Sequence, residues 1–172
     1  MDDVSATLRA GADKVAMNTA AVAQPGLISD AARRFGAQCV VVSIDARQSE
    51  NGWQVVTHGG RSTTTLDAVA WAARAAALGA GELLVTSIDR DGTQQGYDTA
   101  LLQAIAARVR VPVIASGGAG EPAHLADALH AGADAVLVAG ILHRRQESVA
   151  SLKAHLAGAG FAMRGVEATA RA

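Results

Sequence analysis

Asp89, Asp91, Gly92 and Thr93 share one short polar segment, residues 88–98, in the middle of the chain. The segment follows the apolar run 83–85 and precedes a run of helical spacing, 99–108. In a β–α unit, the loop that leaves the strand carries the chemistry. Asp89 and Asp91 are two residues apart, so in an extended chain they point the same way. Either one faces a site while the other braces the loop, or both only form an ordinary turn.

A third carboxylate, Asp45, comes directly after the continuous apolar segment 39–44. A carboxylate at the end of a buried strand is costly unless it is used or paired. We therefore treat Asp45 as a candidate acid–base group. A helix-capping or loop-bracing aspartate is the open alternative.

Small residues follow the last two predicted strands. One strand leads into Ser116, Gly117 and Gly118, and the next leads into Ala139 and Gly140. Glycines let a phosphate approach backbone N–H groups, and a helix N-terminus favours an anion. In (β/α)₈ barrels, phosphate sites are often built from the loops after strands seven and eight. The two loops together therefore predict a phosphate site.

A second anion site is predicted at Asn18 and Thr19, which follow an earlier strand. An internal repeat relates residues 8–15 to residues 129–136, so the two predicted sites face each other across a pseudo-symmetric fold. Two facing phosphate sites imply a substrate that is phosphorylated at both ends.

Apolar segments and helical runs alternate along the chain, which predicts an α/β fold with a parallel sheet. Trp71 is expected to pack between a helix and the sheet, and 53–57 could form a small hairpin arm inside the long polar loop 48–62. Residues 11–17 are predicted to form a turn into a strand, and the other predicted strands are 39–44, 83–86, 111–115 and 135–138. The predicted helices are 2–9, 27–35, 65–78, 99–108, 122–130 and 147–156.

The number of predicted β–α units is smaller than a closed barrel needs. A complete (β/α)₈ barrel has about 250 residues, and this chain has 172. The first copy of the repeat is preceded only by a partial helix, so we expect a partial barrel that contains strands four to eight. We expect a single domain over 1–158 and a C-terminal tail over 159–172.

Composition narrows the function classes. The formal net charge is −1 with no long run of one sign, which argues against a nucleic-acid or membrane-surface protein. No apolar run reaches the roughly 18 residues of a membrane helix, and the acidic N-terminus does not resemble a secretory signal. The five histidines and the single Cys39 show no metal-ligand spacing. We expect a cytoplasmic protein without a metal or other cofactor.

Several segments, in this order, resemble the cyclase subunit of imidazole glycerol phosphate synthase, a family of histidine biosynthesis. The resemblance covers nearly the whole chain. The sister phosphoribosyl isomerase of the same pathway shares the barrel and the doubly phosphorylated substrate, but the runs 86–98 and 116–120 are more similar to the cyclase. The matching segments are 11–15 with 18–19, 42–46, 79–83, 86–93, 96–98 and 114–120.

The resemblance implies a lyase-type cyclase on a (β/α)₈ (TIM) barrel. It takes ammonia and a linear aminoimidazole-carboxamide nucleotide (PRFAR), closes the imidazole ring, and releases imidazole glycerol phosphate and AICAR. The family uses two aspartates for acid–base work, one on the first strand and one on the fifth. Asp45 matches the fifth-strand aspartate, and Asp91 matches a residue that supports binding and chemistry. The first-strand aspartate has no counterpart in this chain.

The resemblance also implies binding residues and a partner. Asn18 and Thr19 match part of one phosphate site. The family receives ammonia from a glutaminase subunit docked on the N-terminal face of the barrel, and Lys14 and Glu82 match charged residues that gate the ammonia entrance. A solvated salt bridge is the alternative interpretation of that pair. The other phosphate site is matched by Gly92, Gly118, Ala139 and Gly140.

Three functions remain open from the sequence. The first is the cyclase, complete only with the first-strand segment. The second is a non-catalytic, phosphate-binding half barrel. The third is the isomerase, which would need no ammonia.

Overall fold

The computed structural model describes residues 1–165. The predicted C-terminal tail, 159–172, therefore falls partly outside the described residues. Within them, the last helix ends at Gly158, and residues 159–165 form neither helix nor strand beyond a short turn.

Five strands run parallel and form the centre of one sheet, which confirms the predicted α/β class. β2 lies between β1 and β5, β6 follows β5, and β7 pairs with β6. A two-stranded antiparallel extension, β3 and β4, continues the sheet from the far end of β2. The bounds are Val15–Met17 (β1), Val40–Ser49 (β2), Gly52–Thr57 (β3), Ser62–Asp67 (β4), Glu82–Ser87 (β5), Val113–Ser116 (β6) and Ala135–Val136 (β7).

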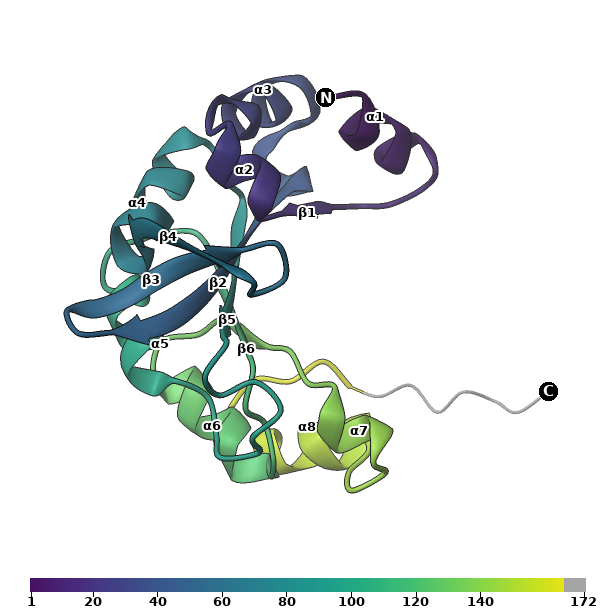
Figure 1. The fold of residues 1–172 in the computed structure, drawn as a ribbon. Helices are drawn as coiled ribbons and strands as arrows, with labels where there is room; N and C mark the ends of the chain where they lie inside the picture. The colour runs from purple at the N-terminus through teal and green to yellow at the C-terminus, as the bar shows by residue number, and fades with distance from the viewer. Residues whose placement is uncertain (166–172) are drawn as a thin grey trace.

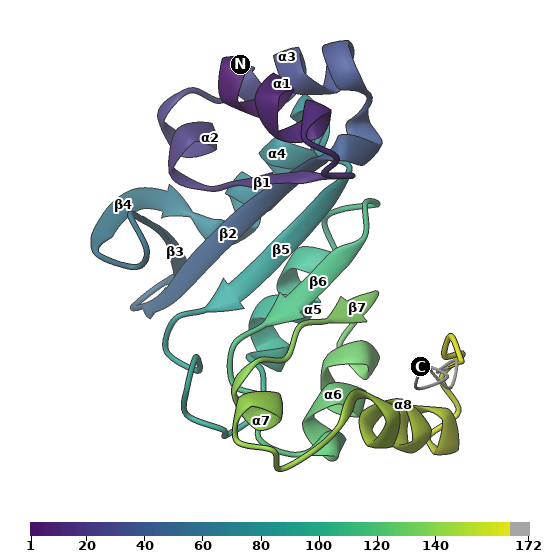
Figure 2. The same ribbon diagram turned by 90° about the vertical axis from the view of Figure 1, so that its right-hand side faces the viewer.

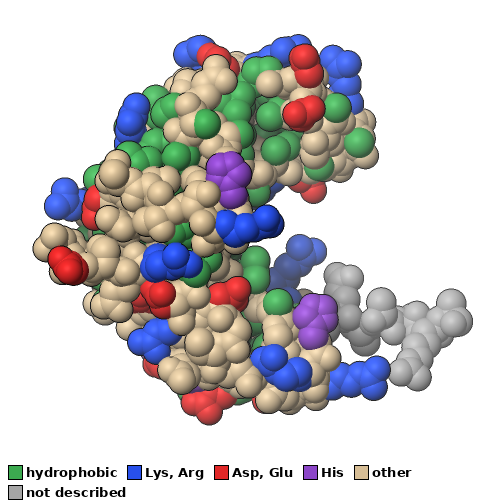
Figure 3. All heavy atoms as spheres, in the orientation of Figure 1, with side chains coloured by type: hydrophobic (Ala, Val, Ile, Leu, Met, Phe, Trp, Pro, Cys, Tyr) green, Lys and Arg blue, Asp and Glu red, His purple; other side chains and the backbone are tan. Residues whose placement is uncertain are grey.

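Helices cover the convex face of this sheet, and the other face borders a hollow (Figures 1 and 3). Figure 2 looks onto the sheet, with β2, β5 and β6 side by side. Within residues 1–165 the sheet curves without closing, so the fold is a partial barrel. The helices are Asp2–Arg9 (α1), Thr19–Ala23 (α2), Gly26–Phe35 (α3), Ala68–Leu78 (α4), Thr99–Ala106 (α5), Pro122–His130 (α6), Gly140–His143 (α7) and Val149–Gly158 (α8), with a 3₁₀ turn at Ala37–Cys39.

Strand β2 shows how the sequence divides the two faces. Alternate side chains of a strand point to opposite faces. Val40, Val42, Ile44 and Ala46 are essentially inaccessible and belong to the core under the helices, whereas Asp45 in between is only half-buried. Trp71, which is 2% exposed, joins this core from α4, as the sequence predicts. The face with the polar residues is therefore the one that borders the hollow.

The segment between β2 and α4 corrects two sequence predictions. The predicted helix 65–78 is wrong at its start, because residues 62–67 form β4 and the helix begins only at Ala68. The reason is the run of threonines, because β-branched residues favour strands over helices. Thr64 also binds the neighbouring strand: its Oγ1 donates to the carbonyl oxygen of Val55 on β3 at 2.7 Å. Asp67 then caps α4 by accepting from the N–H of Ala70 at 2.7 Å.

The predicted polar loop 48–62 is also wrong over most of its length. β2 continues to Ser49 and forms an antiparallel hairpin with β3, so the arm is larger than the 53–57 segment that the sequence suggested. The predicted strand 39–44 is thus observed at 40–49. Other bounds shift less: the predicted strands 111–115 and 135–138 are observed at 113–116 and 135–136, and the predicted helix 147–156 is observed at Val149–Gly158.

Candidate active site

A row of polar side chains crosses the sheet where three parallel strands end. Asp45 on β2 pairs in register with Thr86 on β5, and Thr86 pairs in register with Ser116 on β6. Neighbouring residues in register share one face of a sheet. Buried and partly exposed residues alternate along each of these strands, and all three residues are partly exposed. The row therefore faces the hollow. The sequence analysis selected Asp45 and Ser116 but not Thr86, whose pairing with both becomes visible only through the register.

Among residues 1–165, one neutral donor and no cation binds the side chain of Asp45. The side-chain Nδ2 of Asn18 donates to Asp45 Oδ2 at 3.0 Å and also to the carbonyl oxygen of Val56 on the hairpin at 3.1 Å. Burial raises the pKa of the Asp45 carboxyl; the hydrogen bond from Asn18 opposes this, and the negative charge of Asp91 adds to it. Asp45 therefore holds its proton more tightly than an ordinary aspartate does.

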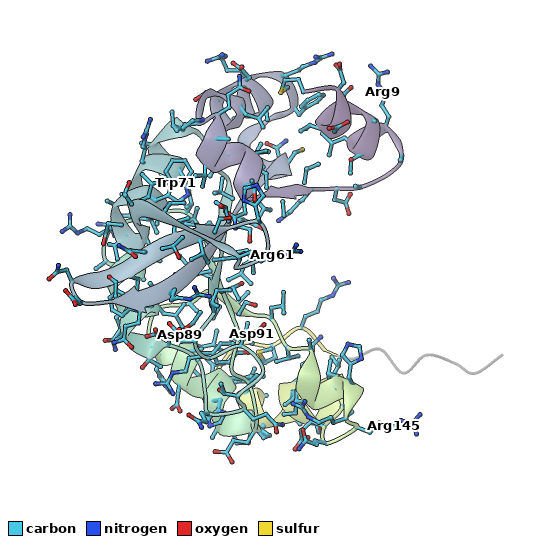
Figure 4. The ribbon with its side chains drawn as sticks, in the orientation of Figure 1. Arg9, Arg61, Trp71, Asp89, Asp91 and Arg145 are labelled. Atoms are coloured by element: carbon cyan, nitrogen blue, oxygen red, sulfur yellow. The ribbon has the colours of Figure 1, made fainter. Side chains whose placement is uncertain are left out.

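Asp89 and Asp91, both in the 88–98 loop, have different contacts. Asp89 accepts a hydrogen bond from the backbone N–H of Gln48 at 2.7 Å and so braces the loop against the end of β2. Asp91 lies on the other side of the loop, against Gly117 and close enough to Asp45 to raise its pKa. Figure 4 shows both side chains on the loop beside the hollow. The interpretation with one bracing and one site-facing carboxylate matches this geometry.

Other bonds fix the hairpin and the 88–98 loop to each other. The indole Nε1 of Trp53 on β3 donates to Asp98 Oδ2 at 2.8 Å. The other oxygen of Asp98 caps α5 by accepting from the N–H of Leu101 at 3.0 Å. One carboxylate thus joins the hairpin, the loop and a helix start, and it holds the loop that carries Asp91.

Gly117 and Gly118 let the loop after β6 approach the 88–98 loop. Both have positive φ, 88° and 107°. A Cβ on Gly117 would lie 2.7 Å from the carbonyl oxygen of Ser87, and a Cβ on Gly118 would lie 2.1 Å from that of Gly96. Only glycine fits such positions. The N–H of Gly96 donates to the Gly118 carbonyl at 2.8 Å, which closes the contact between the loops.

These loops and the loop after β7 enclose a pocket of about 80 Å³. The pocket brings together every residue that the sequence predicted for the phosphate site near the end of the chain, and Asp91 also lines it. Within residues 1–165, the backbone N–H groups of Gly92, Gly118 and Ala139 donate to no other protein atom. The predicted residues that line it are Gly92, Ser116, Gly117, Gly118, Ala139 and Gly140.

Arg144 also lines this pocket, and the sequence analysis did not select it. It follows the four-residue helix α7, and its side chain folds back over Gly140, the residue four positions earlier. The signal that could have found it is the spacing of a glycine and an arginine by one helical turn.

The other predicted anion-binding residues have partners in the protein. Asn18 uses its amide nitrogen on Asp45 and Val56, and its buried Oδ1 finds no hydrogen-bond partner in the part of the chain that the structure describes. Thr19 Oγ1 accepts from the backbone N–H of His58 at 3.0 Å, which leaves the hydroxyl hydrogen available to a ligand. Asn18 and Thr19 thus lie beside Asp45, whereas the pocket lies on the far side of β5.

Lys14 and Glu82 lie at the opposite edge of the sheet, where β1 and β5 begin, and form a salt bridge with each other. Both side chains are partly exposed, at 45% and 21%. Within the described residues there is no group of three or more His, Cys, Asp or Glu side chains that could hold a metal ion, and no helix there is long and apolar enough to cross a membrane.

A family model described as "Histidine biosynthesis protein" matches residues 1–148. The chain belongs to this family. Among curated proteins, it is 56% identical over 169 residues to imidazole glycerol phosphate synthase subunit HisF of Mycobacterium tuberculosis H37Ra, covering 94% of this chain and 63% of that protein. It is 58% identical over 165 residues to the protein of that name from Myxococcus xanthus, covering 95% and 65%.

The histidine biosynthesis family and the partial barrel agree with the fold expected from the sequence. The subunit HisF of Mycobacterium bovis BCG Pasteur is 55% identical over 169 residues, again with 94% of this chain and 63% of that protein covered. The chain thus spans slightly less than two thirds of the length of these relatives.

Proposed function

We propose that this chain forms the substrate-binding and acid–base part of a cyclase that converts PRFAR and ammonia into imidazole glycerol phosphate and AICAR. The name of the relatives, imidazole glycerol phosphate synthase subunit HisF, supports the reaction. The arrangement of Asp45, Asp91 and the small-residue pocket at one edge of the sheet supports the roles given to individual residues.

The observation that carries this proposal is the environment of Asp45. Ring closure needs protons to move to and from nitrogen and oxygen, and a carboxyl group contributes most when its pKa is close to the working pH. Burial and Asp91 both raise the pKa of Asp45 in that direction. No cation binds Asp45 among the described residues, so the carboxyl is not fixed in its ionised form by a salt bridge.

The binding roles follow from the two sides of the row. The pocket beside Ser116 offers unpaired backbone N–H groups to one phosphate, and Asp91 lies at its border. The Thr19 hydroxyl would donate to the other phosphate on the Asp45 side, and Asn18 would hold the Asp45 carboxyl beside it. A substrate phosphorylated at both ends would then lie across the polar row.

Ammonia would enter from the N-terminal edge of the strands. We assign the Lys14–Glu82 pair to that entrance, with a glutaminase subunit docked beneath it as partner in a heterodimer. The relatives are named as subunits of a synthase, which is consistent with a partner chain. The cytoplasmic location, the absence of a cofactor and the division into 1–158 and 159–172 stay predictions.

The test uses this chain joined to the part of the Mycobacterium tuberculosis relative that it does not match. We expect ammonia-dependent conversion of PRFAR by the joined protein, and a loss of about 100-fold or more in kcat for Asp45→Asn. Asp127→Asn, which changes an exposed carboxylate on α6, is the matched control and should keep full activity. Equal turnover of Asp45→Asn and the parent protein would refute the role of Asp45.

The same assay separates the two alternatives. The isomerase would convert the isomerase substrate without any ammonia. A non-catalytic half barrel would leave the joined protein inactive on both substrates, although this chain alone would still bind a bis-phosphorylated ligand.

A further inference from the structure

The phosphate pocket contains one side chain that the proposed function does not yet use, the guanidinium of Arg144. It is the cationic group among the residues that line the pocket. Every other residue there contributes backbone, a small side chain, the aliphatic Leu137 or the carboxylate of Asp91. A dianionic phosphate next to Asp91 would be repelled unless a positive charge compensates.

Gly140 gives Arg144 its position. Side chains on a helix lean toward its N-terminus, so an arginine at the end of the short α7 covers the residue one turn earlier. A Cβ on Gly140 would lie 2.6 Å from Arg144 Nη2 and 3.1 Å from Cζ. The guanidinium therefore occupies the space that any larger residue at position 140 would fill. Gly140 has an ordinary φ, so this space and not backbone strain is what the glycine provides.

Two glutamines hold the guanidinium in place. Gln146 Oε1 accepts from Arg144 Nε at 3.1 Å and from the Gln94 amide nitrogen at 2.9 Å. In the opposite orientation of the Gln94 amide, its oxygen lies 2.7 Å from Arg144 Nη2. Gln94 belongs to the 88–98 loop, so in either orientation the cluster connects that loop to the segment that follows α7.

We propose that Arg144 binds phosphate in the pocket. Gln94 and Gln146 hold its guanidinium, and the missing side chain of Gly140 leaves the space that the guanidinium occupies. This inference rests on the proposed phosphate pocket and adds its charged ligand. Arginine suits the role, because its planar guanidinium can donate two parallel hydrogen bonds to one phosphate. Glutamine partners do not neutralise it, in contrast to a carboxylate, so its charge remains available.

The neighbouring Arg145 provides the matched control. It carries the same charge, does not line the pocket, and extends outward from the end of α7 (Figure 4). Replacing either arginine by glutamine changes the net charge equally. Any effect of long-range charge is therefore common to both variants, and only a direct contact separates them.

The experiment titrates this chain with inorganic phosphate at constant ionic strength and follows the backbone amides of Gly92, Gly118 and Gly140 by NMR. We expect Arg144→Gln to raise the dissociation constant for phosphate by about 10- to 100-fold, the range for a hydrogen bond to a charged group. Arg144→Lys should recover part of this loss, because it keeps the charge without the paired donors. Arg145→Gln should bind as the parent chain does.

A second variant tests the geometry. Gly140→Ala should displace only the flexible end of the Arg144 side chain, so the melting temperature should stay near that of the parent. The variant should lower the affinity for phosphate as much as Arg144→Gln does. The double variant should be no weaker than either single one, because both remove the same contact.

The outcomes separate the two proposals. If phosphate shifts the pocket amides of the parent chain and of Arg144→Gln with equal affinity, the pocket stands and the role of Arg144 is refuted. If phosphate leaves the pocket amides of the parent chain unchanged, the phosphate pocket and the role of Arg144 both fail.

Discussion

The same parallel strands carry charge at both of their ends, but the two edges treat it differently. At the N-terminal edge, Lys14 and Glu82 are partly exposed and neutralise each other. At the C-terminal edge, Asp45 is half-buried, receives one hydrogen bond from the neutral Asn18, and lies near a second carboxylate, Asp91. One edge is electrostatically satisfied, and the other is not.

This difference indicates where the chain accepts a cost for function. A paired charge near solvent contributes little in either direction. A half-buried carboxyl without a cation destabilises the fold whenever it is ionised, and proteins retain such groups mainly at functional sites. The glycines of the C-terminal edge belong to the same pattern, because they hold positive φ at Gly117 and Gly118 in order to bring the two loops together.

The largest effect on stability is expected at these glycines. Gly118→Ala would add a Cβ 2.1 Å from the Gly96 carbonyl oxygen at a φ of 107°. We expect a loss of about 2–4 kcal/mol in the free energy of unfolding, measured by urea denaturation. Gly158→Ala, at the end of α8 with open space around it, is the control and should be neutral or stabilising. A Gly118→Ala variant as stable as the parent would mean that the loops can separate freely.

An intermediate effect is expected from Asp45→Asn, and its size depends on pH. Because the folded pKa of Asp45 is raised above 3.8, its contribution to stability is fully present below 3.8 and is lost as pH rises through the folded value. At neutral pH the ionised carboxylate is a cost that asparagine removes. The melting temperature of Asp45→Asn should therefore exceed that of the parent at pH 7.

Melting curves from pH 3 to 8 check this sign. The advantage of Asp45→Asn should shrink toward the acid end, where the parent carboxyl is protonated in both states. A constant offset across the range, or a parent chain that is the more stable one at pH 7, would contradict the uncompensated charge.

The smallest effect is expected at the N-terminal edge. Lys14→Met should change the free energy of unfolding by less than about 1 kcal/mol, because both partners of the salt bridge are partly exposed. A double-mutant cycle with Glu82→Gln measures the coupling directly. A coupling as large as the Gly118→Ala loss would remove the contrast between the two edges.

The sequence predicted the parallel strands and the positions of most helices, because each parallel strand is a continuous apolar run next to a helical one. It also predicted Asp45 and the glycine loops, since strand ends and paired glycines are visible in the chain. The start of α4 was misplaced at Thr65. The threonines there follow β3 into the sheet, and only Asp67 has the geometry of a helix cap.

Thr86 and Arg144 could not be predicted in the same way. Thr86 gains meaning from its register with Asp45 and Ser116, which lie on strands far apart in the sequence. Arg144 depends on the backward lean of its side chain over Gly140 after a helix of only four residues. The register of Thr86 is set by how separate strands pack, which no local pattern encodes. The spacing of Gly140 and Arg144 is visible in the chain, but it does not show that the arginine lines a pocket.

The register of the polar row also fixes the distance between the pocket and Asp45. Adjacent strands lie about 4.8 Å apart, so two strand spacings place Ser116 about 10 Å from Asp45. A ligand anchored beside Ser116 reaches Asp45 only if its own skeleton spans that length. If the pocket binds phosphate as proposed, a short phosphorylated metabolite would fill it without reaching Asp45, and the spacing of β2, β5 and β6 would select ligands by their length.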